Sequence, residues 1–330
     1  MTIKERFKAN PLTYYGLSIA ASWAGVGSLM NTITITKTFG IISGLMWLVA
    51  NSAACIVFGY IMHRLPTMRT VMRTRAAAYT IGIIGIFQIW VNMTGIRDIF
   101  ADTVIGTGGG AIIAYTVAIS FAVLLFVRGM IRNVLTDSVS WLAVYGLVAF
   151  ITVVSFIQNG ANMDGITWGL ETASLQTGLG KALMLLPGPF AIMYFYSLID
   201  YNELNSDKTQ PVDIKRAFTL GGLFFGAYMI FAFILAFTTF SPALNMIKAI
   251  LISLIAISTV STFIFSLYVV FGNVIGAVLV AGGIMGWHTV MDMGVLGVWT
   301  MMAYARSVII IFCLIIAAFM AYMKRTKGCI

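Results

Sequence analysis

The stretch AASWAGVGSLMNT, residues 20–32, lies inside the first apolar segment of the chain and restricts the folds that the chain can adopt. Its flanks are apolar enough for a membrane helix, but Gly25 and Gly27 each weaken a helix by roughly 1 kcal/mol. Ser22 and Ser28 add polar groups in the middle of the segment. Two interpretations fit. Either the small residues allow helices to pack closely, or the helix is interrupted and its backbone lines a cavity.

The composition identifies a polytopic membrane protein. The chain has 330 residues, of which 60% are apolar and 9% charged, with a mean hydropathy of +0.97. Soluble domains are about 25% charged. Apolar runs of roughly 20 residues, long enough to cross a bilayer, recur along the whole length. The first run begins near Tyr14 and exceeds a signal-peptide core, so we expect no cleaved signal.

We predict ten transmembrane helices, because a lipid-exposed segment must satisfy its own backbone hydrogen bonds. The predicted spans are residues 12–35, 39–63, 77–96, 110–128, 138–158, 180–201, 217–239, 244–268, 270–287 and 298–323. The ninth segment is broken by several glycines, and its sequence fits either a true span or an amphipathic segment at the interface. An interfacial segment would leave nine spans.

The basic residues predict the orientation. Of the twenty Lys and Arg residues, fifteen fall in segments on one side if the spans alternate, and the others are Lys37, Arg97, Lys181, Lys248 and Arg306. The positive-inside rule therefore places both termini in the cytoplasm, in a multi-pass protein of the cell membrane. The net charge of +9 thus reflects topology, and we expect no nucleic-acid partner. The Gly-rich segment 159–179 should be an external loop.

A second irregular stretch is LLPGPFAIMYFY, residues 185–196, where two prolines flank a glycine and cannot continue a regular helix. This stretch lies in the sixth predicted span, and residues 20–32 lie in the first. The first and sixth spans are the opening spans of two halves of five. Interrupted segments at corresponding positions of two halves indicate a transporter built from inverted repeats. We therefore predict one all-α transmembrane domain, residues 1–330, in a 5+5 inverted repeat. Residues 12–158 form the first repeat and 180–323 the second, with broken first and sixth helices.

Hydroxyl groups crowd the stretch LISLIAISTVSTF, residues 251–263, which contains Ser258, Thr259, Ser261 and Thr262. A lone hydroxyl in a membrane helix usually bonds to the carbonyl one turn earlier. Here four hydroxyl residues lie within the five positions 258–262, and their uncharged oxygens suit a small monovalent cation. Three amides within predicted spans, Asn51, Gln88 and Asn92, fit either helix packing or ligand binding. Arg306 lies inside the last span and should be paired or should snorkel to the interface.

Three passages resemble the sodium/solute symporter family, which has the leucine-transporter-like fold of the amino acid-polyamine-organocation superfamily. They are LSIAASWAGVGSLMN with GIISGLMWLVANSA in residues 17–53, RGMIRNVLTDSVSWLAVYG in residues 128–146, and AISTVSTFIFS in residues 256–266. The nucleobase-cation symporters are a second choice, because LIDYNELN at residues 198–205 is similar to their exit from span six.

This resemblance implies a sodium site. Side chains of Ser258 and Thr259, with carbonyls of Ala20, Trp23 and Ile255, would hold Na⁺ as the coupling ion. We expect no organic cofactor. The expected substrate-binding residues are Gly25, Gly27, Ser28, Asn51, Gln88, Phe190 and Tyr194.

We therefore expect a sodium-coupled symporter that moves a small neutral or zwitterionic organic solute by alternating access, and not an enzyme. The alternatives are a non-transporting membrane sensor or interaction protein that keeps the fold, and a proton-coupled or facilitative transporter of the nucleobase type. The expected partners are a small-molecule substrate and the lipid bilayer. The sequence leaves open whether the protein is an oligomer.

Overall fold

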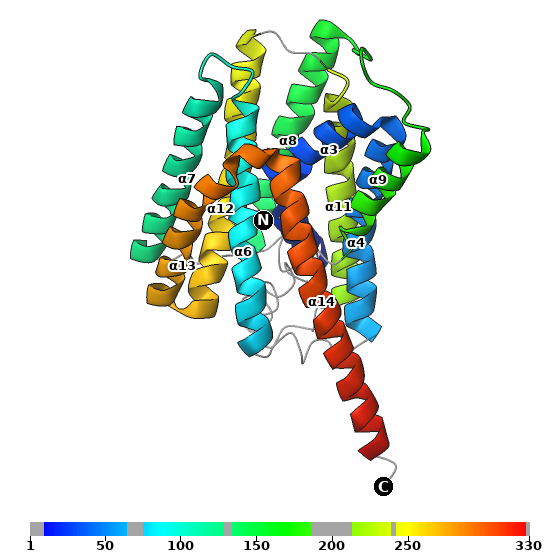
Figure 1. The fold of residues 1–330 in the computed structure, drawn as a ribbon, viewed down its shortest axis with the longest axis vertical. Coiled ribbons are helices and arrows are strands. Elements are labelled where there is room, and N and C mark those ends of the chain that lie inside the picture. The colour runs from blue at the N-terminus through cyan, green and yellow to red at the C-terminus, as the bar shows by residue number, and fades with distance from the viewer. Residues whose placement is uncertain (1–9, 65–74, 129–133, 187–212, 239–241, 328–330) are drawn as a thin grey trace.

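A computed structural model describes residues 10–64, 75–128, 134–186, 213–238 and 242–327, and all of the regular secondary structure in these ranges is helical (Figure 1). The α-helices are α2 (Pro11–Trp23), α3 (Val26–Phe39), α4 (Ile41–Arg64), α6 (Arg75–Ile99), α7 (Gly106–Arg128), α8 (Val134–Asn159), α9 (Thr172–Leu183), α11 (Ile214–Leu235), α12 (Pro242–Phe271), α13 (Asn273–Gly286) and α14 (Gly294–Lys327). Two short 3₁₀ turns, Trp287–Thr289 and Met291–Met293, join α13 to α14.

Six segments in the described part of the chain are long and apolar enough to cross a membrane, so the protein is a polytopic membrane protein. They are Ile41–Arg64, Gly106–Val127, Trp141–Asn159, Ile214–Leu235, Asn245–Tyr268 and Met291–Phe312. Helices also occupy the predicted first, third and ninth spans. The apolar helical stretch at the ninth, Asn273–Thr289, is shorter than the six. Most of the predicted sixth span, 180–201, lies outside the described residues.

The prediction of a loop over residues 159–179 was wrong in part, because α9 begins at Thr172. Before α9 the chain runs back over the start of α4, where Ile41 N–H donates to the Thr167 carbonyl at 3.0 Å. Gly40 and Gly169 meet there with positive φ angles of 92° and 68°. A Cβ on Gly40 would lie 2.6 Å from the Gly169 backbone, so this contact needs both glycines.

The first apolar segment is interrupted, as one interpretation of residues 20–32 predicted. Ala24 ends α2 with φ −76° and ψ 91°, and Gly25 precedes α3 with φ −113° and ψ 170°. Both conformations are extended rather than helical. Close packing is present as well, because a Cβ on Gly27 would clash with the Val91 side chain of α6. The helix is therefore interrupted at Ala24 and Gly25 and closely packed at Gly27, so both interpretations hold, at neighbouring positions.

The helices on either side of the interruption pack into the interior. α11 packs against α4 and α2, and α12 packs against α6. Figure 1 shows α11 beside α4 and α12 beside α6. α7 and α13 lie together at one side, and α14 runs along α6 before extending past the other helices at its C-terminal end. The interior is therefore formed by α2, α3, α4, α6, α11, α12 and the first half of α14.

Several contacts come in pairs when the predicted halves are compared. In the first half α6 packs on α7, and in the second α12 packs on α13. Contacts between the two halves are also paired: α7 of the first half packs on α12 of the second, and α13 of the second half packs on α6 of the first. Likewise α14 contacts α6, and α8 contacts α12. Each of these three contacts has a counterpart made by the helices at the corresponding positions of the other half, whereas the packing of α11 on α8 has no counterpart of similar extent between the described residues of α4 and α14.

The start of α14 is fixed against α6. Asp98 accepts a hydrogen bond from the Val295 N–H at 2.9 Å, which gives one of the unpaired donors at this helix start an acceptor. In the connection before it, Trp287 Nε1 donates to Thr94 Oγ1 at 2.8 Å. These bonds set the position of α14. They therefore also set the positions of Trp299 and Arg306, the two residues of this helix that line a cavity in the interior.

Candidate functional site

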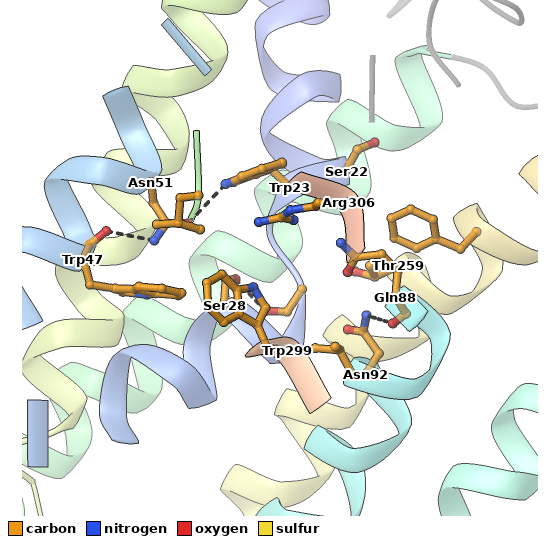
Figure 2. A pocket seen from close by; sticks show the side chains of 15 residues that line it. Ser22, Trp23, Ser28, Trp47, Asn51, Gln88, Asn92, Thr259, Trp299 and Arg306 are labelled. Carbon is orange, nitrogen blue, oxygen red and sulfur yellow. Dashed lines mark hydrogen bonds between the residues drawn. The ribbon is translucent and has the colours of Figure 1, made fainter. Parts of the chain in front are cut away.

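A cavity lies at the interruption between α2 and α3 (Figure 2), and about 450 Å³ of empty space surrounds it when the part open to the outside is included. Its walls come from α2, α3, α4, α6, α12 and α14 and from the segment after α9. The lining residues are Ser22, Trp23, Gly25, Gly27, Ser28, Trp47, Asn51, Gln88, Val91, Asn92, Leu185, Thr259, Phe263, Trp299 and Arg306. Among the described residues, this set contains one charged side chain, that of Arg306.

The interrupted backbone exposes polar groups to this cavity. Gly25 N–H donates to the Trp23 carbonyl at 3.1 Å, and the Gly25 carbonyl accepts from Ser28 Oγ at 2.7 Å. The first N–H groups of α3, on Val26 and Gly27, have no acceptor in their own helix. A helix N-terminus also carries a partial positive charge. The Gly25 carbonyl also accepts from the Ser28 and Leu29 N–H groups, whereas the Ala24 carbonyl lies outside the helical ladder and contacts Thr259 Oγ1.

Four uncharged oxygen atoms gather between the interruption and α12. Thr259 Oγ1 lies 3.3 Å from the Ala24 carbonyl oxygen and 3.4 Å from that of Ile255. Asn92 Oδ1 is buried and has no hydrogen-bond partner among the described residues. A Cβ on Gly25 would lie 2.9 Å from Asn92 Oδ1 and 3.3 Å from Thr259 Oγ1. The missing side chain at Gly25 thus leaves the space that these oxygens border.

The orientation of the Asn92 amide follows from its second contact. Its Nδ2 donates to the Gln88 carbonyl at 2.8 Å, one turn earlier on α6, as Figure 2 shows. With the nitrogen used in this way, the oxygen is the atom left without a partner. A buried acceptor that lacks a donor costs free energy unless a ligand or water satisfies it. The oxygen cluster is therefore suited to a cation.

The opposite side of the cavity is aromatic. Trp23 Nε1 donates to Asn51 Oδ1 at 3.3 Å, and Asn51 Nδ2 donates to the Trp47 carbonyl at 2.8 Å. The Trp47 and Trp299 rings pack edge to face, with centroids 4.7 Å apart. Trp47 is buried, and its Nε1 has no partner among the described residues. The indole rings of Trp23, Trp47 and Trp299 therefore form a largely apolar wall around the Asn51 amide. The Trp47 N–H is a donor on this wall that has no acceptor among the described residues.

Arg306 brings a guanidinium group to this cavity from α14. The residue is 1% exposed. Its Nη2 donates to the Met184 carbonyl at 3.1 Å, and the guanidinium carbon lies 5.7 Å from the centre of the Trp299 ring. Its Nε has no hydrogen-bond partner among the described residues. In the described part of the chain its hydrogen-bond partner is therefore a backbone carbonyl, and no carboxylate there pairs with it.

Seven of the residues predicted from the sequence line the cavity together. They are Trp23, Gly25, Gly27, Ser28, Asn51, Gln88 and Thr259. Ala20 and Ile255 are buried beside it, and their carbonyls accept from Ala24 N–H and Thr259 Oγ1. Ser258 belongs to α12, but its side chain is outside what the structure describes, as are Phe190 and Tyr194.

The sequence interpretation missed four of the residues that define the site. The carbonyl that contacts Thr259 across the interruption belongs to Ala24, which was not among the predicted ligands. Trp47 and Trp299 were not selected, and Arg306 was noted only as a charge that needs a partner. One signal was available, because Trp299 and Arg306 are seven residues apart and share a face of one helix.

Comparison with known proteins identifies no family. No protein-family model and no curated protein matches the sequence. Among solved structures, the manganese transporter of Eremococcus coleocola, in complex with an aromatic bis-isothiourea substituted compound, is 14% identical with a TM-score of 0.41. The alignment covers 97% of this chain and 74% of that one. A mutant of the same transporter gives 13% identity and the same TM-score of 0.41.

Proposed function

We propose that this protein is a secondary transporter that carries a small organic solute across the cell membrane by alternating access, coupled to sodium. The observation that carries the proposal is the cavity at the α2–α3 interruption, which faces Thr259 of α12. Non-helical backbone at membrane depth is tolerated where it lines such a cavity. Discontinuous helices that surround a central site are typical of secondary transporters.

The sodium site in this proposal is the oxygen cluster. The carbonyls of Ala24 and Ile255, the Thr259 hydroxyl and Asn92 Oδ1 would hold the ion, with Ser258, Ala20 and Trp23 as further candidates. Unwound backbone carbonyls and helix ends serve as Na⁺ ligands in transporters of this kind. The unpartnered Asn92 oxygen supports a cation here, because sodium would satisfy it without adding a buried negative charge.

The alternating-access step requires two bodies that move relative to each other around a fixed site. The paired helix contacts between residues 12–158 and 180–323 support an inverted repeat, because a pseudo-two-fold axis makes each contact twice. In this proposal both termini are cytoplasmic. Sodium must bind the outward-open state more tightly than the inward-open state, since a ligand with equal affinity for both shifts no equilibrium.

The first test is the thermal stability of the purified protein in sodium chloride and in choline chloride of equal concentration. We expect sodium to raise the melting temperature of the wild type and to have no effect on Thr259→Ala. Ser253→Ala is the matched control, because Ser253 lies on the same helix and its hydroxyl bonds back to the Ala249 carbonyl at 2.7 Å. It lies outside the cavity lining and should keep the sodium response.

Uptake into proteoliposomes then separates transport from binding alone. A solute that accumulates against its gradient only when sodium is higher outside would support the complete proposal. Sodium-dependent stabilisation without uptake of any solute that binds would instead support a non-transporting sensor. Equal stability in sodium and choline, for wild type and both variants, would remove sodium coupling and leave a proton-coupled or facilitative transporter.

A further inference from the structure

We infer that the solute carried by the proposed transporter is a small organic monocarboxylate, that Arg306 of α14 and the indole N–H of Trp47 bind its carboxylate, and that the ring of Trp299 contacts its apolar part. This inference rests on the proposed function and deepens it by naming the substrate class. Figure 2 shows Arg306 in the central part of the lining in this view, between the Asn51 side and the Thr259 side.

The first argument is the state of the guanidinium group. A guanidinium has five N–H donors in a planar fork, and it is charged at all physiological pH values. In the described part of the chain one hydrogen bond is present, to the Met184 carbonyl, and Nε is buried without a partner. A buried charge is costly unless it is paired and hydrogen-bonded. A guanidinium with free N–H groups can donate two parallel hydrogen bonds to one carboxylate.

The second argument comes from the neighbouring donor. Trp47 Nε1 is also buried without a partner among the described residues, and its ring contacts the ring of Trp299, over which the arginine lies. Two unsatisfied groups on this side are therefore donors, whereas the unsatisfied group on the α6 side, Asn92 Oδ1, is an acceptor. An anion would satisfy the two donors, Arg306 Nε and Trp47 Nε1, and a cation would satisfy the acceptor, Asn92 Oδ1.

The third argument is the charge of the cavity as a whole. Among the described lining residues there is one cation and no carboxylate. A sodium ion in the oxygen cluster would add a second positive charge to the same cavity. Two like charges in a site of low dielectric repel each other strongly. A monocarboxylate bound between them offsets this repulsion, so the solute and the ion would increase each other's affinity.

The test is binding of benzoate to the purified protein, measured by titration calorimetry and by thermal shift in sodium chloride of fixed concentration. Benzamide is the matched probe, because it has nearly the same shape without the charge. We expect benzoate to bind and to raise the melting temperature, and benzamide to do neither. Benzoate bound no more tightly than benzamide by the wild type would overturn the inference.

Arg306→Gln and Arg306→Lys then test the residue itself. Hydrogen bonds to charged groups contribute enough that we expect Arg306→Gln to weaken benzoate binding about tenfold to hundredfold. Arg306→Lys keeps the charge but loses the planar fork, so it should bind benzoate with intermediate affinity. Lys181→Gln is the control, because Lys181 also reaches α14, through Thr300 at 2.6 Å, but lies outside the cavity lining.

The outcomes separate the inference from the proposed function. Benzoate that binds through Arg306, when neither it nor any other carboxylate that binds is taken up by proteoliposomes, would keep Arg306 as a carboxylate-binding residue and overturn transport. Uptake of a neutral or cationic solute that Arg306→Gln leaves unchanged would keep transport and overturn the inference. If Arg306→Gln does not fold, the benzoate and benzamide comparison and Arg306→Lys still decide. Unchanged benzoate affinity in Arg306→Lys would indicate that the fork is not used.

Discussion

The hydroxyl oxygen of Thr259 lies 3.3 Å from the carbonyl oxygen of Ala24, which is 235 positions earlier in the chain. The contact joins the point where α2 ends to the middle of α12. It exists because Ala24 is extended and its carbonyl points away from the helical ladder. The same hydroxyl also contacts the Ile255 carbonyl one turn earlier, so the two helices share one oxygen cluster.

Replacing Gly25 should close this cluster. The Cβ of Gly25→Ala would lie 2.9 Å from Asn92 Oδ1, closer than carbon and oxygen atoms normally approach. We expect a loss of about 1–3 kcal/mol in the free energy of unfolding, the usual cost of overpacking. We also expect no sodium-dependent rise in melting temperature. Gly108→Ala in α7, where the added carbon meets nothing within 4 Å, should leave the sodium response unchanged. An intact response in Gly25→Ala would show that sodium does not occupy this space.

Removing the unpartnered amide oxygen should weaken sodium binding more than it weakens the fold. Asn92→Ala loses one hydrogen bond to the Gln88 carbonyl, which costs about 1 kcal/mol of stability. It also removes one of the proposed ion ligands, so the sodium concentration that gives half of the maximal thermal shift should rise about tenfold. Asn31→Ala is the control. Asn31 is a buried amide without a partner among the described residues, and it lies outside the cavity lining. Equal sodium dependence in the two variants would remove Asn92 from the site.

The indole N–H of Trp47 should matter for solute binding but not for stability. Trp47→Phe keeps an aromatic ring against Trp299 and removes a donor that has no partner among the described residues. We expect benzoate to bind about tenfold more weakly, since one charge-assisted hydrogen bond is lost. Trp141→Phe removes a similarly unpartnered indole donor outside the cavity and should not change the affinity. Titration calorimetry on both variants measures the difference, and equal affinities would show that the Trp47 donor is not used.

Asp98 should stabilise the start of α14 independently of any ligand. Its carboxylate accepts from Val295 N–H at 2.9 Å and is ion-paired with Arg97. Losing such a helix-capping acceptor costs about 0.5–2 kcal/mol, so Asp98→Ala should lower the melting temperature by a few degrees. Asp292→Ala is the comparison, because that carboxylate is exposed and lies 3.8 Å from Arg97. Exposed pairs contribute little, so this variant should melt within about one degree of the wild type. A larger loss for Asp292→Ala would contradict the assignment.

Much of the fold could be predicted because membrane helices are specified by local composition. Every apolar segment needs about 20 residues and must pair its own backbone, so the spans can be read along the chain. The interruption near Gly25 was predictable for the same reason, since glycines in an apolar segment weaken the helix locally. The helix at Thr172 was missed, because its sequence is polar and Gly-rich and its position depends on contacts with α4.

The site was predicted best where its residues lie close together in sequence, although the isolated amides Asn51 and Gln88 were also selected and line the cavity. Hydroxyls around Thr259 and glycines around Gly25 mark two walls, and both were identified. The remaining walls are formed by single residues on different helices, such as Trp47 on α4 and Asn92 on α6. An isolated tryptophan or amide in a span has many structural roles, so its type alone carries little information.

The sequence by itself determined that this protein is a polytopic helical membrane protein with a weakened first helix and an oxygen-rich segment around Thr259. The tertiary structure alone decided that Ala24, Asn92 and Thr259 share one oxygen cluster and that Arg306 reaches the same cavity. The physical reason is that helix formation depends on neighbours within one turn. The cavity depends on which faces of six helices meet, and that is fixed by packing between residues far apart in the chain.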